Sequence, residues 1–489
     1  MTLDTKSRTI SENKRWKILL IVAAFFLYQN IFTQSITWQR LYNGPYNQQD
    51  ICSDICHASN GNFFAIGSSK KPTTQGYFIY VIKFNAQGDT LWTRIIDSLS
   101  NEAISCAETG DGGVVIVGEG HFALKLDSAG NIAWKKVYNL SGIKCFDIIR
   151  TTEGKFLACG EHLIVNGSTF RYDSYVMELD LNGNLLWDTS YLALFDKPLN
   201  SVIEIAGQGY IFTGYERRFI GDTNKCLVLR TNKTGSIAWE KNMKILSRGA
   251  IGKKVQQLGN TITIAGGTTD ETQTLLEVFF LRLDYSGNIV SQKLLISNAS
   301  ENLTSFEILN QNRYALTSYN TSDIAKSIVS DTNGVIIYER SYVSSYYTFL
   351  FSVLPLSNGD ILWGGAGRFT IEDADVWIIR TDSLLNSPQI AVDPISTFVP
   401  SKYQLYQNYP NPFNPATKIK FDISGSSAAQ TSLSVYDITG KEISLLVNAD
   451  LKPGSYEISF DASGLSSGVY FYKISTGSFT DVKKMVLLK

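Results

Sequence analysis

The chain has 489 residues, of which 44% are hydrophobic and 18% are charged, and its formal net charge at pH 7 is −1. This length exceeds one ordinary hydrophobic core unless the core is built from repeats, and the balanced charge offers no basic surface for nucleic acid. Its three histidines lack metal-site spacing and no CxxC pair occurs, so neither a metal nor a cofactor is expected.

The first segment has the pattern of an export signal. Lys14, Arg15 and Lys17 precede the apolar run 18–27, and a basic flank before about ten apolar residues is typical of a secretory signal peptide. A membrane helix needs about 20 apolar residues, so an uncleaved anchor is only the alternative. We predict a signal peptide over residues 1–34 and no membrane-spanning helix after it.

Self-similar segments fill the middle of the chain. Each has an alternating strand, an Asp or Asn, two residues, a Gly and a second strand with Trp near its start, as in ALKLDSAGNIAWKKVY from Ala123. The Asp or Asn recurs every 42 to 53 residues, and a period of this size indicates a repeat architecture. The markers are Asn85, Asp127, Asp180, Asn232, Asp284, Asp331 and Asp382.

The Asp/Asn-x-x-Gly signal predicts a hairpin turn. An Asp or Asn side chain can bond the backbone two residues further on, and Gly supplies the positive φ of a tight turn. A calcium loop would need further carboxylates, which the repeat lacks.

A second marker runs in phase with the first and completes the unit. It is a turn followed by a short apolar strand that ends on a small residue, and another strand precedes it. One unit is therefore four antiparallel strands in about 50 residues, the size of a propeller blade. The small residues are Gly67, Gly118, Gly160, Gly214, Gly266, Ser318 and Gly364.

The seventh unit lacks its Trp-bearing fourth strand, because Gln389 of a Pro-containing linker stands there. A segment resembling that strand, ITWQRLY from Ile36, lies at the start of the mature chain. Pairing it beside the seventh unit would join the two ends of a ring and leave no exposed edge. We predict an all-β protein whose residues 35–384 form a seven-bladed β-propeller closed in this way; six or eight blades are the alternatives.

Tryptophans share one column of the repeat. A ring of aromatic side chains could stack on a ligand, but a packing contact between neighbouring blades is the simpler interpretation. The residues are Trp38, Trp92, Trp134, Trp187 and Trp239.

Six cysteines occur, all in the first half of the chain. A chain this large does not need a disulfide framework, so we interpret them as small apolar strand residues, with disulfides as the alternative. They are Cys52, Cys56, Cys106, Cys145, Cys159 and Cys226.

The repeat resembles the quinoprotein-like propellers, in which a D-x-x-G-x-x-x-W hairpin recurs. The resemblance covers residue 36 to about residue 383 and concerns the fold. The enzymes of this group bind pyrroloquinoline quinone with an adjacent cysteine pair and acidic calcium ligands. No two cysteines are adjacent in this chain, so the resemblance implies no cofactor.

After the repeats, Pro388, Pro394 and Pro400 mark a linker over residues 385–402. Residues 403–489 then alternate in five or more short segments, with glycines at the turns. This pattern predicts a small immunoglobulin-like β-sandwich.

The same stretch resembles the type A sorting domain of the type IX secretion system of Bacteroidota. The resemblance is carried by the segments 408–415 (containing YPNPFNP), 435–440 (VYDITG), 452–460, 467–472 (SGVYFY) and 483–489 (KKMVLLK). It implies transport by that machinery across the outer membrane, followed by surface attachment or release. A generic immunoglobulin-like module of the flagellar hook-cap type is the alternative. The motif residues are Asn408, Pro410, Pro412, Asp437, Gly440, Gly468, Tyr470, Lys483 and Lys484.

The sequence contains no G-x-S-x-G, no GxxxxGK[ST] and no HExxH motif, so no catalytic residue is assigned. The loops of one propeller face vary most between repeats, and such loops on a rigid scaffold usually carry binding. The candidate binding-face residues are Arg171, Tyr172, Arg217, Arg218 and Arg368.

Two hypotheses follow for the molecular role. The first is a secreted or cell-surface, non-catalytic propeller that binds a glycan or a protein. The second is a secreted carbohydrate-active enzyme, a glycosidase or lyase, whose acidic residues lie on the loop face of separate blades.

Overall fold

The computed structural model describes residues 37–488 apart from 45, 47–48, 73–75, 98–101, 168, 219–222, 270–274, 298–299, 321–323, 343–347, 368–373, 388–399, 415, 428, 441, 463–464 and 478. The predicted signal peptide lies outside these residues. Within the described part of the chain, no helix has the length and apolar character needed to cross a membrane.

The strands up to residue 381 form four-stranded antiparallel sheets, which we number 1 to 7. Sheets 1 and 2 consist of β2 (Asp50–His57), β3 (Phe63–Lys70), β4 (Tyr77–Phe84) and β5 (Thr90–Ile96), then β6 (Ala103–Glu108), β7 (Val114–Gly118), β8 (Phe122–Leu126) and β9 (Ile132–Val137). Sheets 3 and 4 consist of β10 (Ile143–Arg150), β11 (Phe156–Asn166), β12 (Thr169–Leu179) and β13 (Leu185–Tyr191), then β14 (Leu199–Ile205), β15 (Gly209–Glu216), β16 (Lys225–Thr231) and β17 (Ile237–Met243).

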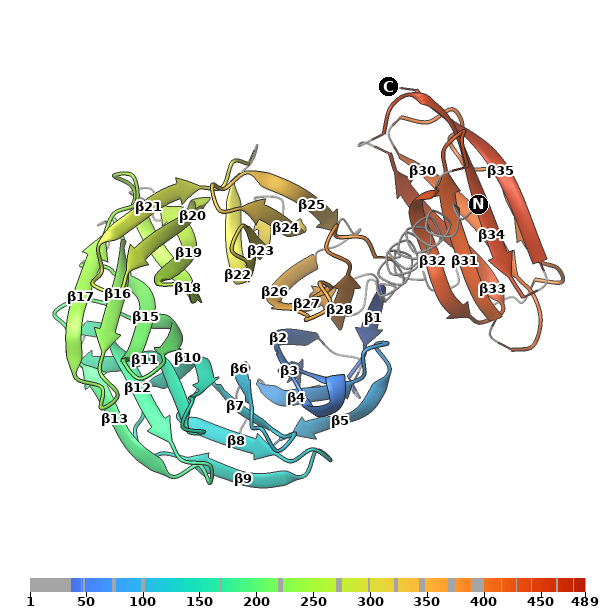
Figure 1. Ribbon diagram of the computed structural model, residues 1–489. Helices are drawn as coiled ribbons and strands as arrows, with labels where there is room; N and C mark the ends of the chain where they lie inside the picture. Colours follow the sequence, from blue (N-terminus) through green and yellow to red (C-terminus); the bar gives the residue numbers. More distant parts are fainter. Residues whose placement is uncertain are drawn as a thin grey trace, which may run out of the picture. The chain divides into compact units, whose positions relative to one another are not determined.

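Sheets 5 and 6 consist of β18 (Gly249–Leu258), β19 (Thr261–Thr269), β20 (Leu275–Asp284) and β21 (Ile289–Leu294), then β22 (Glu301–Asn310), β23 (Arg313–Asn320), β24 (Ala325–Asp331) and β25 (Ile336–Tyr342). Sheet 7 consists of β26 (Thr348–Pro355), β27 (Ile361–Gly367), β28 (Asp375–Thr381) and β1 (Trp38–Tyr42). Figure 1 shows the sheets arranged in a ring, with the first strand of each towards the centre and the last at the rim.

The ring is closed by the first strand of the described chain. Strand β1 pairs antiparallel with β28, in a register that sets Trp38 opposite Arg380 and Tyr42 opposite Val376. The pairing expected for the Trp38 segment is thus confirmed, and β28 presents no open edge to solvent.

The Asp/Asn-x-x-Gly turns have the expected geometry. In sheet 2, Asp127 Oδ1 accepts the backbone N–H of Ala129 at 2.9 Å and that of Asn131 at 2.8 Å, and Gly130 has a φ of +83°. In the seventh turn Leu385 takes the glycine position with a φ of +64°. The same pair of bonds recurs at Asn85, Asp180, Asn232, Asp284, Asp331 and Asp382.

Each tryptophan of the shared column packs on the turn of the next sheet. Trp134 Nε1 donates to the Leu181 carbonyl at 3.0 Å, and a Cβ added to Gly183 would lie 2.7 Å from the Trp134 ring. The column is therefore a repeated contact between neighbouring sheets, as the packing interpretation requires. The other pairs are Trp38 with Gly88, Trp92 with Gly130, Trp187 with Gly235 and Trp239 with Gly287.

Apolar side chains form a separate core between each pair of adjacent sheets. Between sheets 1 and 2, for example, Phe64 and Val81 pack with Ile116 and Leu124. Clusters of the same kind join every further pair, including sheet 7 with sheet 1. The sheets thus bury their faces against one another rather than in one central core.

A β-bulge interrupts the innermost strand of each sheet. In sheet 1 the register shifts between Cys52 and Asp54, and a Cβ on Gly67 would lie 1.8 Å from the Ile51 carbonyl oxygen. The recurrent glycine of the second strand is thus required by the close approach of the bulged strand. Equivalent shifts lie at Ala103/Ser105, Cys145/Asp147, Leu199/Ser201, Gly252/Lys254, Leu303/Ser305 and Leu350/Ser352.

One marker position of the sequence analysis needs correction. In sheet 7 the small residue opposite the bulge is Gly365, which pairs with Leu350, and not Gly364. A Cβ on Gly365 would lie 1.8 Å from the Phe349 carbonyl oxygen, whereas one on Gly364 would meet the Ile55 side chain instead. Two successive glycines made the pattern ambiguous by one residue.

The C-terminal unit has two antiparallel sheets. One contains β29 (Gln404–Leu405), β30 (Ala416–Ile423) and β33 (Gly454–Asp461), and the other β32 (Glu442–Leu451), β31 (Ala429–Tyr436), β34 (Gly468–Thr476) and β35 (Phe479–Leu487). Buried residues of both sheets, such as Phe421 and Tyr472, share one core.

The closure of the ring can be tested at Trp38, which is 4% exposed. We expect Trp38→Ala to lower the free energy of unfolding by about 3 kcal/mol, because it removes a buried indole and leaves a cavity. Trp134→Ala removes the same contact at a half-buried position and should cost less. Denaturant unfolding of the mature chain, monitored by circular dichroism, measures the free energy of unfolding of both variants. An equal decrease in the two variants would contradict the role of Trp38 in closing the ring.

Candidate functional site

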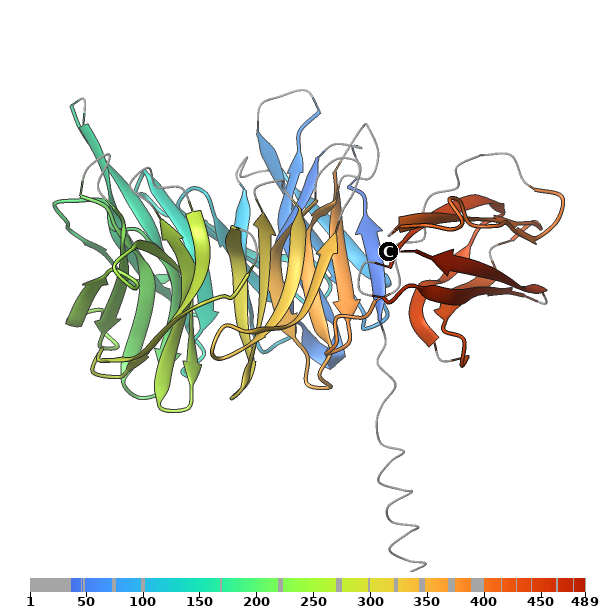
Figure 2. The same cartoon turned by 90° about the horizontal axis from the view of Figure 1, so that it is seen from above.

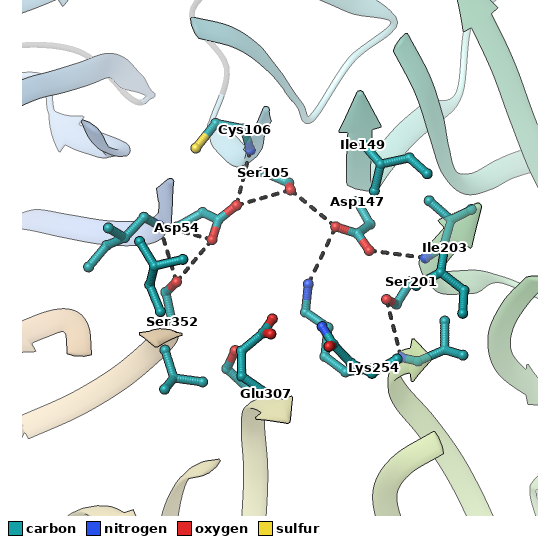
Figure 3. A pocket seen from close by; sticks show the side chains of 17 residues that line it. Asp54, Ser105, Cys106, Asp147, Ile149, Ser201, Ile203, Lys254, Glu307 and Ser352 are labelled. Atoms are coloured by element: carbon teal, nitrogen blue, oxygen red, sulfur yellow. Dashed lines mark hydrogen bonds and ion pairs between the residues drawn. The ribbon is translucent and has the colours of Figure 1, made fainter. Parts of the chain in front are cut away.

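Side chains at equivalent positions of the seven innermost strands converge on the centre of the ring (Figure 3). Each follows the bulge of its strand, so the bulge directs the side chain inward. Together with Glu307, two residues after the sixth of them, they line a cavity of about 200 Å³. The seven residues are Asp54, Ser105, Asp147, Ser201, Lys254, Ser305 and Ser352.

Asp54 ties three sheets together. Its Oδ2 accepts the Cys106 backbone N–H and the Ser105 hydroxyl of sheet 2, each at 3.1 Å. Its Oδ1 accepts the Ser352 hydroxyl of sheet 7 at 2.9 Å and the N–H of Ile55 at 2.9 Å. The carboxylate therefore has hydrogen-bond partners on both oxygens.

Asp147 makes the corresponding junction on the other side of Ser105. It accepts the Val202 N–H at 3.0 Å and the Ser105 hydroxyl at 3.3 Å, and Lys254 Nζ lies 3.3 Å from its Oδ1. A serine hydroxyl has one proton, so Ser105 donates to only one of the two flanking carboxylates at a time.

The charges of the cavity act on one another. Burial raises the pKa of Asp54, the Lys254 charge opposes this shift, and the Asp147 charge adds to it. Burial alone would lower the pKa of Lys254, but the Asp147 and Asp54 carboxylates outweigh it, so this pKa lies above its ordinary value. Lys254 is thus the cation that compensates two carboxylates.

Glu307 is a further carboxyl group in the cavity whose protonation is shifted. Burial raises its pKa to about 8, opposed by the positive charge of Lys254 and reinforced by the Asp147 and Asp54 charges. At neutral pH its carboxyl group is therefore mostly protonated and can donate a hydrogen bond.

The size and chemistry of the cavity limit what it can hold. A volume of about 200 Å³ corresponds to about seven waters at about 30 Å³ each and lies below the 300–1,000 Å³ typical of ligand pockets. Within the described residues no group of His, Cys, Asp and Glu side chains is arranged to hold a metal ion. The cavity therefore suits water or one small polar molecule rather than a polysaccharide chain.

The loop-face residues named from the sequence gather at the junction of sheets 3 and 4. Arg171 Nε lies 2.9 Å from Asp173 Oδ1. Asp196 accepts the Tyr172 backbone N–H at 3.0 Å and is paired with Arg217 at 2.6 Å. Asp196 and Arg217 thus hold the loops of two sheets together, whereas Arg171 pairs with a carboxylate of its own strand.

Arg218 belongs to the same cluster. Its Nε lies 3.3 Å from Glu216 Oε1, and its guanidinium group lies 5.5 Å from the centre of the Phe195 ring. Arg368, the fifth predicted residue, lies outside the described residues, so its part in a binding face stays a prediction.

Exposed apolar side chains, missed in the sequence, occur on the same hairpin and loop as these residues. The β11–β12 hairpin extends beyond its neighbours (Figure 2, teal), and Val165 and Phe170 near its tip are 67% and 64% exposed. In the following loop Leu192 and Leu194 are 80% and 89% exposed. Phe170 contacts the Tyr172 ring at 6.3 Å between centroids. We call Val165, Phe170, Tyr172, Leu192 and Leu194 the hairpin surface.

The sorting-motif residues hold the two ends of the C-terminal unit together. Asn408 is buried, and its side-chain amide donates to the Pro410 carbonyl and to Thr417 Oγ1. The Lys484 carbonyl accepts a bond from Gln407. The peptide bonds before Pro410 and Pro412 are cis.

The remaining sorting residues lie at turns and strand ends. Asp437 Oδ1 accepts the Thr439 N–H, and Gly440 has a φ of +82°. Gly468 begins β34, where the Tyr470 hydroxyl donates to the Ser466 carbonyl. Lys483 lies in β35, with its Nζ 3.9 Å from Asp481. These positions therefore have local structural roles, and their role in sorting stays a prediction.

Comparison with known proteins identifies the C-terminal unit. Residues 407–488 match the family described as secretion system C-terminal sorting domain, which confirms the resemblance seen in the sequence. No curated protein matches the chain.

Solved structures similar to the chain are propeller-like. A streptogramin B lyase has 10% identity and a TM-score of 0.46, covering 70% of this chain and 97% of that one. A catalytically inactive virginiamycin B lyase from Staphylococcus aureus with quinupristin has 12% identity and a TM-score of 0.46, covering 70% and 99%. YCF48 bound to the D1 peptide has 10% identity and a TM-score of 0.44, covering 72% and 96%. At these identities and TM-scores the likeness carries no conclusion about what this chain binds or does.

The cavity residues also escaped the sequence analysis. A signal was present, because each stands at nearly the same distance before the recurrent small residue of its unit, as Asp54 does before Gly67 and Ser105 before Gly118. Their chemistry differs from unit to unit, so the repeat pattern gave no reason to group them.

The protonation of Glu307 can be tested by pH. Between about pH 4.5, where it ionises in the unfolded chain, and about pH 8, only the folded state holds the proton, so the free energy of unfolding falls as pH rises. Glu307→Gln should reduce this slope, so that between pH 5 and pH 8 its free energy of unfolding falls by about 1–2 kcal/mol less than that of the wild type, after allowance for screening. Denaturant unfolding at both pH values measures it, with exposed Glu119→Gln as the control; an unchanged slope in Glu307→Gln would contradict the assignment.

Proposed function

We propose that this chain, which its C-terminal sorting domain directs out of the cell, is a non-catalytic binding protein that contacts an extracellular protein through the hairpin surface. The sorting domain indicates secretion with release or attachment at the cell surface, and the secretion machinery is its partner during export. The proposal concerns the molecular role of the repeats.

We also propose the finer description of the fold. Seven four-stranded sheets before residue 388 support a seven-bladed β-propeller closed by β1, with domain bounds near 35–384. The two sheets on a shared core support an immunoglobulin-like sandwich over residues 403–489, after a linker over 385–402. The quinoprotein-like relationship stays a prediction.

The observation that carries the binding proposal is the exposed apolar surface on an extended hairpin. Strands β11 and β12 have 11 residues each, whereas β7 and β8 of the preceding sheet have five. Leu194 is 89% exposed, and an isolated chain gains nothing from holding such side chains in water. Clustered apolar side chains with a polar rim are typical of protein interaction sites.

The hairpin surface is also held in place, which lowers the entropy lost on binding. Asp173 is fully buried, and it accepts the Ala193 N–H as well as the Arg171 side chain. Asp196 fixes the same loop to Tyr172 and Arg217. The exposed side chains therefore project from a loop whose backbone is anchored at both ends.

The chemistry of the surface favours a protein over a glycan. Three of its members, Val165, Leu192 and Leu194, are aliphatic, and the nearby arginines are paired with carboxylates of the chain itself. Aliphatic side chains offer a sugar hydroxyl no hydrogen bond, whereas they match the apolar centre of a protein interface.

The protonated carboxyl group of Glu307 favours the second candidate function, a carbohydrate-active enzyme, since a general acid needs a raised pKa. Against it, the cavity of about 200 Å³ is small for a glycan. In addition, Asp54 and Asp147 accept bonds from neighbouring sheets, which favours a structural role for both.

The proposal is tested with the full mature chain immobilised and exposed to proteins shed from the cell surface. We expect the double variant Phe170→Asp, Leu194→Asp to reduce retention of the bound protein at least about tenfold, because it places two charges in an apolar interface. The control is Ile132→Asp on the outer strand of sheet 2, where the side chain is 52% exposed; it should retain binding.

Two results would contradict the proposal. One is equal retention by wild type and the hairpin variant. The other is release of reducing sugar from a polysaccharide panel by the wild-type chain, with loss of that release in Glu307→Gln, which would establish the second candidate function.

A further inference from the structure

The six cysteines lie in clearly separated environments, with one exception. Each cluster of apolar side chains between two sheets contains at most one cysteine, except the cluster between sheets 1 and 2. There Cys106 is a buried member, and Cys56 packs against the cluster. The isolated cysteines are Cys52, Cys145, Cys159 and Cys226, in four different clusters.

Strand geometry directs these two thiols towards one another. Asp54 and Cys56 lie on the same face of β2, because side chains two residues apart share a face, and Asp54 bonds the Cys106 N–H of β6 at 3.1 Å. The neighbouring Cys56 thiol also contributes to the raised pKa of the Cys106 thiol. They are 50 residues apart in the sequence and belong to adjacent sheets.

The pair Cys145 and Cys159 shows that closeness of two strands is not sufficient for a disulfide. Both lie in sheet 3, on adjacent strands whose register sets Cys159 opposite Asp147. Their side chains, however, belong to clusters on opposite faces of the sheet, Cys145 towards sheet 2 and Cys159 towards sheet 4. A disulfide needs its Cβ atoms to face each other, so this pair cannot form one.

We propose that Cys56 and Cys106 form a disulfide that joins sheet 1 to sheet 2 in the exported protein. The exported chain leaves the reducing cytoplasm, and the bacterial periplasm is oxidising. The inference rests on export and does not depend on the binding role of the hairpin surface.

The reaction is thiol–disulfide exchange with a disulfide-bearing oxidant protein of the periplasm. One thiolate of the chain attacks the oxidant disulfide, which forms a mixed disulfide and releases one oxidant thiolate. The second thiolate of the chain then attacks the mixed disulfide and releases the other oxidant thiolate. The chain loses two protons and two electrons, one S–S bond forms in the chain, and the oxidant becomes a dithiol.

Exposure decides which thiol reacts first. Cys56 is half-buried, whereas Cys106 is 6% exposed, and burial raises the pKa of the Cys106 thiol. A thiol with a raised pKa is a poor nucleophile. Cys56 is therefore the attacking group, and the bond forms most readily before sheets 1 and 2 have packed completely.

The test counts free thiols in full-length mature protein recovered from outside the cell. The protein is denatured and alkylated, with and without prior reduction, and the number of adducts is determined by mass spectrometry. Of six cysteines, four should react without reductant and all six after reduction, and peptide mapping should join the Cys56 and Cys106 peptides. Six adducts without reductant, or a bond between other cysteines, would overturn the proposal.

Two variants sharpen the count. In Cys56→Ser all five remaining thiols should react without reductant. In the matched control Cys226→Ser, which removes a cysteine alone in its cluster, three should react without reductant and five after reduction. The thiol count and peptide map of the wild-type protein test the disulfide without any variant, so the test remains valid even if a variant fails to fold.

Stability gives an independent readout. Reduction of the wild-type protein should raise its unfolding equilibrium constant at least about tenfold, since the cross-link restricts the unfolded chain. Cys56→Ser should match the reduced wild type and show no response to reductant. An identical constant for oxidised and reduced wild-type protein would contradict a cross-link between the sheets.

Discussion

The ring depends on the junction where its two ends meet at one carbonyl group. The Ala86 oxygen of sheet 1 accepts Trp38 Nε1 at 2.9 Å and Arg380 Nη1 at 2.7 Å, and Arg380 is held by buried Asp360 at 2.8 Å. Every other junction joins sheets that are consecutive in the chain. Within the described residues, this junction, the β1–β28 pairing and the Ser352–Asp54 bond each join segments more than 290 residues apart. Together they offset the entropy of closing the whole ring.

The bulged innermost strands connect this architecture to the centre of the molecule. The bulge brings a strand against a glycine of its neighbour, as Ile51 against Gly67, and it also turns the following side chain inward. In sheets 1 and 3 that side chain is a carboxylate that accepts a backbone N–H of the next sheet. The polar cavity is thus a product of how the sheets are joined, which explains why its carboxylates have structural partners and why specificity is better sought on the loops.

Much of the fold could be predicted because the geometry of its turns follows from the residue types at fixed positions. Asp127 and Gly130 fix a hairpin locally, and Trp134 packs on the next turn, so pattern and structure agree. The closing strand was predictable because Trp38 belongs to the same column. The cavity residues and the hairpin surface were not predicted. The cavity residues, such as Asp54 and Lys254, recur at nearly the same place in each unit but differ in chemistry, so the repeat gave no reason to group them. The exposure of Leu194 is not encoded in any local pattern. Four of the five loop-face residues do gather, but the arginines among them pair with carboxylates such as Asp173 and Asp196 that the sequence did not link to them.

Hydrogen exchange in the segment Asp375–Thr381 tests the closed ring most directly. As an inner strand between β27 and β1, β28 should have its backbone amides protected on both sides, and mass spectrometry of the full mature chain should show slow exchange throughout this segment, comparable to β27. Fast exchange of alternate amides, as expected for an unpaired edge strand, would show that β1 does not pair with β28 and would contradict a ring closed by the Trp38 strand.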